Sequence, residues 1–445
     1  MTPFDRKPRA RKKPASHIAL AIALATGTAL IGTVAAQPAY AKKKEKKAAP
    51  YSKEFVAAFT PVQEALNTEG ADMNATAAQI PALVALANTP DEKNAAGSMA
   101  YNVGLKAQNQ DLQLQGIGLM LESGKIDEAN LGKFNFLGYQ LATVAGKHTQ
   151  ARAYLEQAIQ HNFSTAEVTP AALRIAMAES YFNENRIDEG LDYLSTAIAE
   201  QKAAGQPVDV QWYRRGLSVA YNASNPKVYK FVTGWIGDYP SESNWRDAIN
   251  IARNLNEYAG AEMLDLMRLN YRKGTIKNKQ EYIDYVEAAD ARRLPKEVQT
   301  VINQGYASGH VSKDDIYIAD ALKMASGRIA ADRSELPALE RDARAANAGI
   351  RTVVAAGDAF LSYGEAGKAA EFYSKALNMP GVDRNLVLTR LGIAQSDAGD
   401  FADAKANFDQ VTGKRAPIAM LWAAYMAEKT GAAAPAATTV ASTEG

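Results

Sequence analysis

The chain has 445 residues, no cysteine, 47% hydrophobic residues and a formal net charge of +1. That length and apolar content suffice for two or three ordinary domains or for one continuous repeat array, and they exclude wholesale disorder. The absence of cysteine excludes disulfides, thiolate metal sites and a cysteine nucleophile. Alanine is abundant, and alternating runs of Val, Ile and Thr are missing, so the composition predicts an all-α protein.

The near-neutral net charge hides an uneven distribution. Residues 1–50 hold eleven Lys and Arg against Asp5 and Glu45, which gives +9, and the rest of the chain therefore carries −8. Duplex binding draws on a positively charged face, so the acidic body argues against a nucleic-acid partner.

The first 41 residues have the three parts of a secretory signal peptide. A basic stretch, 6–13, precedes an uncharged apolar run, 18–36, and small residues at Ala39 and Ala41 fit the pattern that signal peptidase cleaves. We therefore expect residues 1–41 to be removed and the product to be periplasmic in a bacterium with two membranes. The alternative is an inner-membrane anchor that holds the body outside the cytoplasm, because the apolar run approaches the roughly 20 residues that span a bilayer. Only in that case is the membrane a partner.

The body follows a short basic segment. Residues 42–50 are expected to form a flexible, basic lead-in. Over 51–430, helical blocks alternate with short breaks that contain Gly, Asn, Asp or Pro, which predicts one domain of helical hairpins.

Two stretches near the C-terminus show the internal repeat most clearly. Small, turn and aromatic positions of 353–376 recur 35 residues later in 388–411: Gly357 and Gly392, Gly364 and Gly399, Ala369 and Ala404, Tyr373 and Phe408. We interpret the first glycine pair as points where helices approach too closely for a Cβ, and the second pair as left-handed turn residues. We expect the alanines to face the first helix and the aromatics to fill the gap to the next hairpin.

This spacing resembles the tetratricopeptide repeat (TPR), a helix–turn–helix unit of about 34 residues. Further units with this pattern begin upstream near Leu137, Tyr181, Trp212 and Trp245, so the clearest repeats span 131–272 and 350–412. Residues 52–124, 278–308 and 312–346 have hairpin-like lengths without the small-residue signature.

The resemblance implies a right-handed superhelix (solenoid) of antiparallel helical hairpins, about ten in all, with a C-terminal capping helix. Residues 414–429 are the candidate cap, and 431–445 are expected to be a disordered tail. An irregular helical bundle is the alternative, although it does not explain the periodicity.

The residue patterns indicate no catalysis, cofactor or metal. His17, His148, His161 and His310 lack metal-ligand spacing, and the chain has no nucleophile elbow or phosphate-binding loop. An Asp72-x-Asn74-x-Thr76 sequence lacks the glycine and the bidentate glutamate of an EF-hand, so we interpret it as a capping turn.

In TPR proteins the first helix of each hairpin lines a concave groove that takes extended peptides or partner helices. Transfer of the groove positions to this chain gives a hypothetical partner-binding set: Asn135, Tyr139, Glu179, Tyr213, Arg246, Asn250, Arg253, Asp358 and Ser396. Spacings of four and three place Arg246, Asn250 and Arg253 on one helix face. Arg and Asn can hold a peptide carboxylate or its backbone amides. The alternative is a solvated polar face.

These features together predict a periplasmic or cell-envelope scaffold that binds protein or peptide partners and performs no catalysis. Two alternatives remain open: a helical domain of a peptidoglycan- or glycan-acting enzyme, and a membrane-anchored structural envelope protein.

Overall fold

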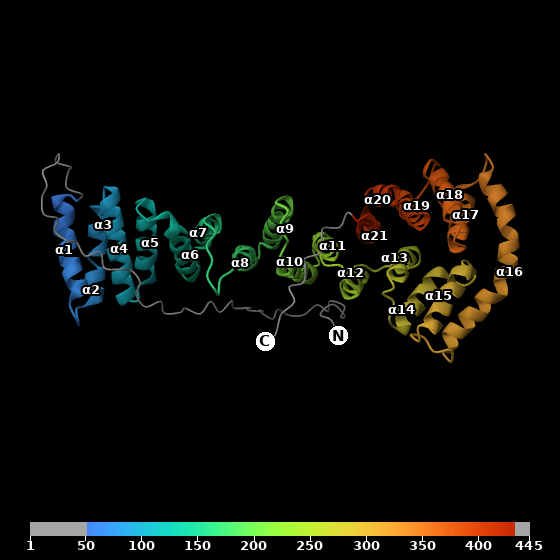
Figure 1. Cartoon of the computed structure of the whole chain (residues 1–445), viewed down its shortest axis with the longest axis horizontal. Coiled ribbons are helices and arrows are strands. Elements are labelled where there is room, and N and C mark those ends of the chain that lie inside the picture. Colours follow the sequence, from blue (N-terminus) through green and yellow to red (C-terminus); the bar gives the residue numbers. More distant parts are fainter. Residues whose placement is uncertain (1–50, 432–445) are drawn as a thin grey trace. The chain divides into compact units, whose positions relative to one another are not determined.

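The computed structural model describes residues 51–431, and every regular element in this part of the chain is helical (Figure 1). This confirms the all-α, TPR-like prediction. The expected signal peptide, the basic lead-in and residues 432–445 of the expected tail lie outside the described residues. Among the described helices, none has the length and apolarity that crossing a membrane requires. The helices form two compact units that divide between residues 185 and 186.

The N-terminal unit begins with a long helix and two short ones, and regular hairpins follow. Its helices are α1 (Lys53–Asn67), α2 (Met73–Ala77), α3 (Ile80–Ala85), α4 (Pro90–Lys106), α5 (Gln110–Glu122), α6 (Glu128–Val144), α7 (His148–Gln160) and α8 (Pro170–Phe182). The carboxylate of Asp72 caps α2 by accepting the N–H groups of Asn74 and Ala75 at 2.9 and 3.1 Å, which confirms the capping-turn interpretation.

Helices α4 and α5 approach each other so closely that glycine is required on both. A Cβ on Gly116 would lie 2.5 Å from the carbonyl oxygen of Gly97, and one on Gly97 would lie 2.8 Å from the carbonyl oxygen of Gly116. Because the obstacle is backbone on both sides, no side-chain rotation relieves the overlap. The glycines therefore set the distance between these helices.

The C-terminal unit continues the hairpins and contains one exception. Its helices are α9 (Ile187–Ala203), α10 (Val210–Asn222), α11 (Val228–Asp238), α12 (Glu242–Leu255), α13 (Ala261–Arg272), α14 (Lys279–Ala289), α15 (Pro295–Ala307), α16 (Ile316–Arg344), α17 (Ile350–Ser362), α18 (Ala366–Leu377), α19 (Arg384–Ala398), α20 (Phe401–Phe408), the 3-10 helix η1 (Gly413–Arg415) and α21 (Ala416–Lys429).

The exception is α16, because 312–346 has the length of a hairpin but forms a single helix of 29 residues. A hairpin needs a turn, and Gly327, near the middle of this segment, lies inside the continuous helix and is not among the glycines with positive φ. Residues 312–346 therefore contribute one helix to the array where a hairpin would contribute two.

In four of the six recognisable hairpins, a glycine of the first helix lies under an aromatic ring of the second. A Cβ on Gly357 would come within 2.6 Å of the Tyr373 ring, and one on Gly392 within 2.6 Å of the Phe408 ring. The same pairing recurs between Gly138 and Tyr154 and between Gly216 and Phe231. These aromatics therefore pack within their own hairpins, and Phe408 also stacks on Trp422 of α21, as expected for a ring that fills the gap to the next element.

The turn glycines behave as predicted. Gly364 and Gly399 have φ values of +77° and +91°, in the left-handed region that favours glycine. Each ends the first helix of its hairpin, so the chain reverses at these two positions.

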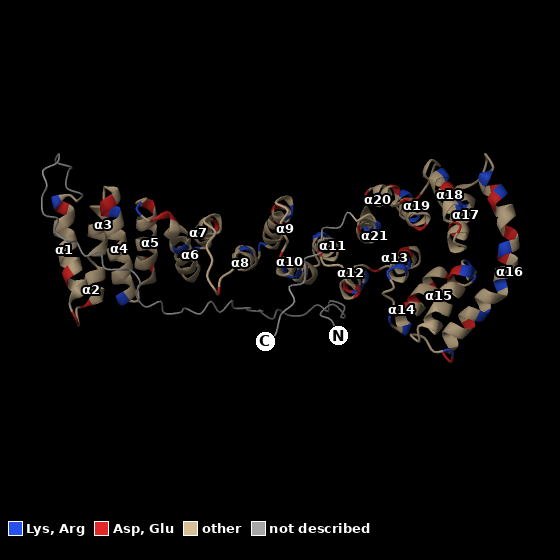
Figure 2. Cartoon of the chain, in the orientation of Figure 1, with Lys and Arg blue, Asp and Glu red and all other residues tan. Residues whose placement is uncertain are grey.

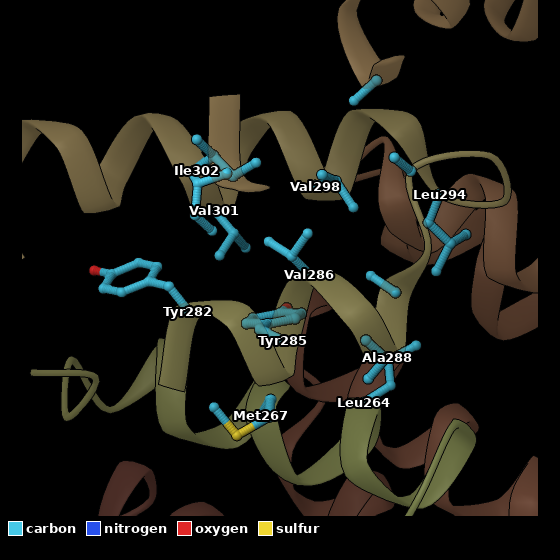
Figure 3. Packing of buried hydrophobic residues seen from close by; sticks show 14 of the residues in the cluster. Leu264, Met267, Tyr282, Tyr285, Val286, Ala288, Leu294, Val298, Val301 and Ile302 are labelled. Atoms are coloured by element: carbon cyan, nitrogen blue, oxygen red, sulfur yellow. The ribbon is translucent and has the colours of Figure 1, made fainter. Parts of the chain in front are cut away.

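The core of the C-terminal unit runs continuously from hairpin to hairpin. Figure 3 shows one section, where Leu264 and Met267 of α13 meet Tyr285 and Val286 of α14, and α15 covers them with Val298 and its neighbours. Helices α14 and α15 thus each bury one face against the preceding helix and another against the following one.

The last helix does more than cap the final hairpin. As expected, α21 packs on α20, but it also packs against α11, α12 and α13. The Trp245 indole N–H donates to the Glu428 carboxylate at 2.9 Å, and Lys273 Nζ lies 2.7 Å from the same group. The C-terminal unit therefore closes on itself.

We predict that Gly116→Ala destabilises the N-terminal unit by about 1–3 kcal/mol, because the added methyl overlaps backbone. The matched control is Gly118→Ala on the same helix, where the nearest obstacle is the Tyr154 hydroxyl at 3.3 Å. All four tryptophans lie beyond residue 185. In urea unfolding of the full chain, Gly116→Ala should move the circular-dichroism transition and leave the tryptophan-fluorescence transition in place. Equal shifts for both alanine variants would contradict this account.

Candidate functional site

Three predicted groove residues lie together on one face of α12. The helix starts after Ser241, whose hydroxyl accepts the N–H of Asn244 at 3.1 Å, and its buried face is anchored by Trp245. Arg246, Asn250 and Arg253 are half-exposed on another face. We call these three residues the α12 stripe.

Acidic residues of α14 meet the α12 stripe. Arg246 Nη2 lies 3.6 Å from Glu281 Oε1, and Arg253 forms an ion pair with Asp284. The Nε–H of Arg246 is buried and has no hydrogen-bond acceptor in the described structure. The stripe thus consists of two partly neutralised arginines, one unsatisfied N–H donor, and an amide between them.

Two further groove residues lie close together in the N-terminal unit. Tyr139 of α6 and Glu179 of α8 are half-exposed. Burial raises the pKa of the Tyr139 hydroxyl, the side chain of Thr143 opposes that shift, and the negative charge of Glu179 reinforces it. Asn135 is buried on α6 and donates to the Leu131 carbonyl oxygen at 2.9 Å, so its amide is already engaged within its own helix.

The remaining groove residues are buried inside the C-terminal unit. Tyr213 donates its hydroxyl to Asp238, and Ser396 is buried on α19. Asp358 accepts hydrogen bonds from both Arg390 and the Tyr373 hydroxyl, each at 2.7 Å. The structure therefore places these three side chains in the interior, apart from the surface of the α12 stripe.

Asp358 belongs to a buried ionic cluster centred on Asp265 of α13, which we call the Asp265 cluster. Its carboxylates and guanidinium groups come from Asp265, Arg268, Glu297, Asp358, Arg390 and Arg415. Three carboxylates face three guanidinium groups, so the cluster is formally neutral. Neutrality is what allows so many ionised groups to leave water together.

Asp265 joins segments that are far apart in sequence. Its carboxylate lies 2.6 Å from Arg415 Nη1 and 3.4 Å from Arg390 Nε, and its backbone carbonyl accepts the Trp422 indole N–H at 3.0 Å. Burial raises the pKa of Asp265, but Arg390, Arg415 and Arg268 outweigh that effect, and the pKa lies below its usual value. Asp265 is therefore ionised and holds α13, α19 and η1–α21 together.

Arg268 extends the cluster toward α14 and α15. Its Nε and Nη2 donate to the two oxygens of Glu297 at 2.8 and 2.7 Å, and the Tyr285 hydroxyl donates to the same carboxylate at 2.8 Å. Burial raises the pKa of Glu297, but the charge of Arg268 and these hydrogen bonds lower it to about 2. These two parallel hydrogen bonds connect α13 to α15.

Within residues 51–431, no group of three His, Asp or Glu side chains is arranged to hold a metal ion. Every carboxylate of the Asp265 cluster is bonded to at least one arginine. The cluster can therefore hold helices together, and the α12 stripe can offer hydrogen bonds to an external ligand.

The sequence reasoning did not identify the Asp265 cluster. A local signal exists, because Asp265 and Arg268 interrupt the apolar run of α13 three residues apart, on the side that the leucines bury. Their partners Arg390 and Arg415 follow more than 120 residues later, and no periodicity links them to α13.

The hairpins and their glycine–aromatic packing define a TPR-like helical-repeat protein. No family model matches the sequence, and no curated protein matches it. Among solved structures, the crystal structure of the APC/C hetero-tetramer Cut9–Hcn1 aligns over 86% of this chain and 73% of that chain, with 10% identity and a TM-score of 0.21. At that TM-score the likeness has no bearing on function, and the fold is assigned from the hairpins themselves.

We predict that Glu297→Gln destabilises the C-terminal unit by about 3–5 kcal/mol at neutral pH, because Arg268 loses its bidentate counter-charge in the interior. The folded-state pKa of about 2 lies below the ordinary value of 4.5, so the contribution of Glu297 is complete above pH 4.5 and is lost as the pH falls toward 2. The stability difference between wild type and variant should therefore shrink across that window.

Urea unfolding followed by tryptophan fluorescence measures this difference at each pH. Glu335→Gln, which removes an exposed carboxylate from α16, is the control and should change stability little. A difference between wild type and Glu297→Gln that stays constant with pH would show that folding does not lower the pKa of Glu297.

Proposed function

We propose that this chain is an exported scaffold of the bacterial cell envelope that binds a protein or peptide partner through the α12 stripe. Support for export comes from residues 1–41, where a basic segment, an apolar run and Ala39-x-Ala41 follow one another as in a cleaved signal. Support for binding comes from the surface chemistry of α12.

The observation that carries this proposal is the pair of half-exposed guanidinium groups, those of Arg246 and Arg253, on one face of α12. A guanidinium group has five N–H donors, which can bind a partner carbonyl or carboxylate. Asn250 lies one turn away on the same face and can both donate to and accept from a peptide backbone.

The ion pairs to α14 fit this role. Arg246 and Arg253 are held in place by Glu281 and Asp284, so their guanidinium groups are oriented before a partner arrives. Preorganised side chains lose less rotamer freedom on binding, which favours affinity. In the N-terminal unit, Tyr139 and Glu179 offer a second, smaller polar surface.

We predict that a photoreactive residue in place of Asn250 crosslinks a protein partner in intact cells. A photoreactive residue in place of Arg214, an exposed side chain of α10, is the control and should yield no specific product.

Arg246→Ala/Arg253→Ala, combined with the Asn250 probe, should reduce the amount of crosslinked product at least about tenfold, whereas the exposed pair Arg214→Ala/Arg351→Ala should not. A product unaffected by loss of both stripe arginines would exclude the α12 stripe as the binding surface.

The export part of the proposal has its own test. Mass spectrometry of the purified chain should find Lys42 as the first residue, because cleavage after Ala41 fits the signal pattern. A chain that keeps residues 1–41 and stays with membranes after a carbonate wash would favour the anchor alternative instead.

A further inference from the structure

The single helix α16 leaves one layer of the C-terminal unit incomplete. The first half of α16 packs against α15, and its second half packs against α17 (Figure 1). It therefore lies between the hairpins α14–α15 and α17–α18 and has no partner helix of its own. Of its 29 residues only Ile318, Ala325, Leu336 and Ala343 are buried, at spacings that trace one narrow stripe. A helix in a repeat array is ordinarily covered on two sides, so α16 has an open flank.

A cleft of about 550 Å³ lies on that flank. It is lined by Gln299 of α15 and by Ser326, Ile329, Ala330, Arg333 and Ser334 of α16. The Gln299 amide donates to the Ser326 hydroxyl at 3.3 Å, which links the two walls. Ser326, Ala330 and Ser334 are spaced four apart, so small side chains line the α16 side of the cleft and another helix can approach closely.

Basic residues predominate on the cleft side of α16. Successive residues of a helix are rotated by about 100° around its axis, so Lys323 lies on the same side of α16 as Ala330. Arg333 lines the cleft itself. The acids Asp332 and Glu335 fall on the opposite side from Ala330, and Figure 2 shows both kinds of charge along the helix.

The basic side of α16 is not neutralised from within. Glu340, which lies two turns after Arg333 on that flank of the helix, is already bonded to Arg344 and Lys368 at 3.0 Å each. Arg333 and Lys323 are exposed and form no ion pair within residues 51–431. The cleft therefore combines an open helix flank with uncompensated positive charge, in contrast to the α12 stripe, whose arginines are paired.

We propose that this cleft is a docking site for an acidic α-helix of a partner protein. The incoming helix takes the place of the missing second helix of the layer, sets small side chains against Ser326 and Ala330, and presents carboxylates to Arg333. A cleft of this volume admits the side chains of one helix face and not a whole domain. The site uses different helices and different chemistry from the α12 stripe, so it extends beyond the proposed function and stands independently of it.

The test measures binding of a peptide to the full mature chain by fluorescence anisotropy. The peptide is labelled with fluorescein, is rich in Ala, has about 15 residues and carries Glu at every fourth position. Binding is expected, and it should weaken as salt is raised, because exposed charges are screened. A peptide with Gln in place of each Glu should bind at least about tenfold more weakly, as should one with the same Glu residues scattered around the helix. Equal binding of all three peptides would overturn the proposal.

Variants of α16 locate the site. Arg333→Glu should weaken binding of the Glu peptide at least about tenfold, whereas Arg328→Glu makes the same charge change on the opposite side of α16 and should change it less than about twofold. Ala330→Trp fills the cleft without changing charge and should also abolish binding, so the proposal does not depend on one variant folding. Circular dichroism checks that each variant keeps its helices.

The same measurement separates this site from the α12 stripe. Arg246→Ala/Arg253→Ala should leave peptide binding unchanged. Loss of binding in that variant, or equal losses in Arg333→Glu and Arg328→Glu, would overturn the cleft assignment. Neither result bears on the photocrosslinking at Asn250, so the two proposals fail separately.

Discussion

Asp265 is the constraint on which the C-terminal unit depends. Its carboxylate and its backbone carbonyl are both buried, and both are bonded to groups that come from the other end of the unit, Arg390, Arg415 and Trp422. A carboxylate in this position is tolerated only when guanidinium groups surround it, so the chain must return to α13 for the fold to form. The return brings α21 against α11–α13 and turns a row of hairpins into a closed body. The curvature of the intervening hairpins is thereby fixed to the one that lets the ends meet.

Within four of the hairpins, α6–α7, α10–α11, α17–α18 and α19–α20, a different and steric rule operates. A glycine on the first helix removes a Cβ, and an aromatic ring from the second helix fills that space, as Tyr373 does over Gly357 and Phe408 over Gly392. The aromatic ring supplies buried apolar area, and the glycine sets how close the helices come. Where two glycines face each other, as Gly97 and Gly116 do, the backbones themselves touch. Spacing between helices is thus set locally, whereas the path of the C-terminal unit is constrained by distant ionic contacts.

This division explains why binding surfaces can vary on such a scaffold. The side chains that hold the fold are buried glycines, aromatics and the Asp265 cluster, and none of them belongs to the α12 stripe or to the α16 cleft. Residues on those two surfaces can therefore change with little cost in stability. The two surfaces also differ in character: the α12 stripe is preorganised by ion pairs to α14, and the α16 cleft keeps its positive charge uncompensated. Under the two proposals made above, one scaffold would bind two segments of different chemistry.

The sequence by itself determined the helices, their pairing into hairpins and the turns at Gly364 and Gly399, because these features depend on residues within about 35 positions of one another. It also placed Arg246, Asn250 and Arg253 on one face, since four- and three-residue spacings suffice for that. Only the tertiary structure decided that Tyr213, Asp358 and Ser396 are buried, that 316–344 is one helix, and that α21 returns to α13. Burial at a groove position depends on which helix lies opposite to it. Which helix lies opposite depends on the small rotations of all the intervening hairpins added together. No local pattern in the chain encodes that sum, which is why the partners of Asp265 became visible only once the unit had closed.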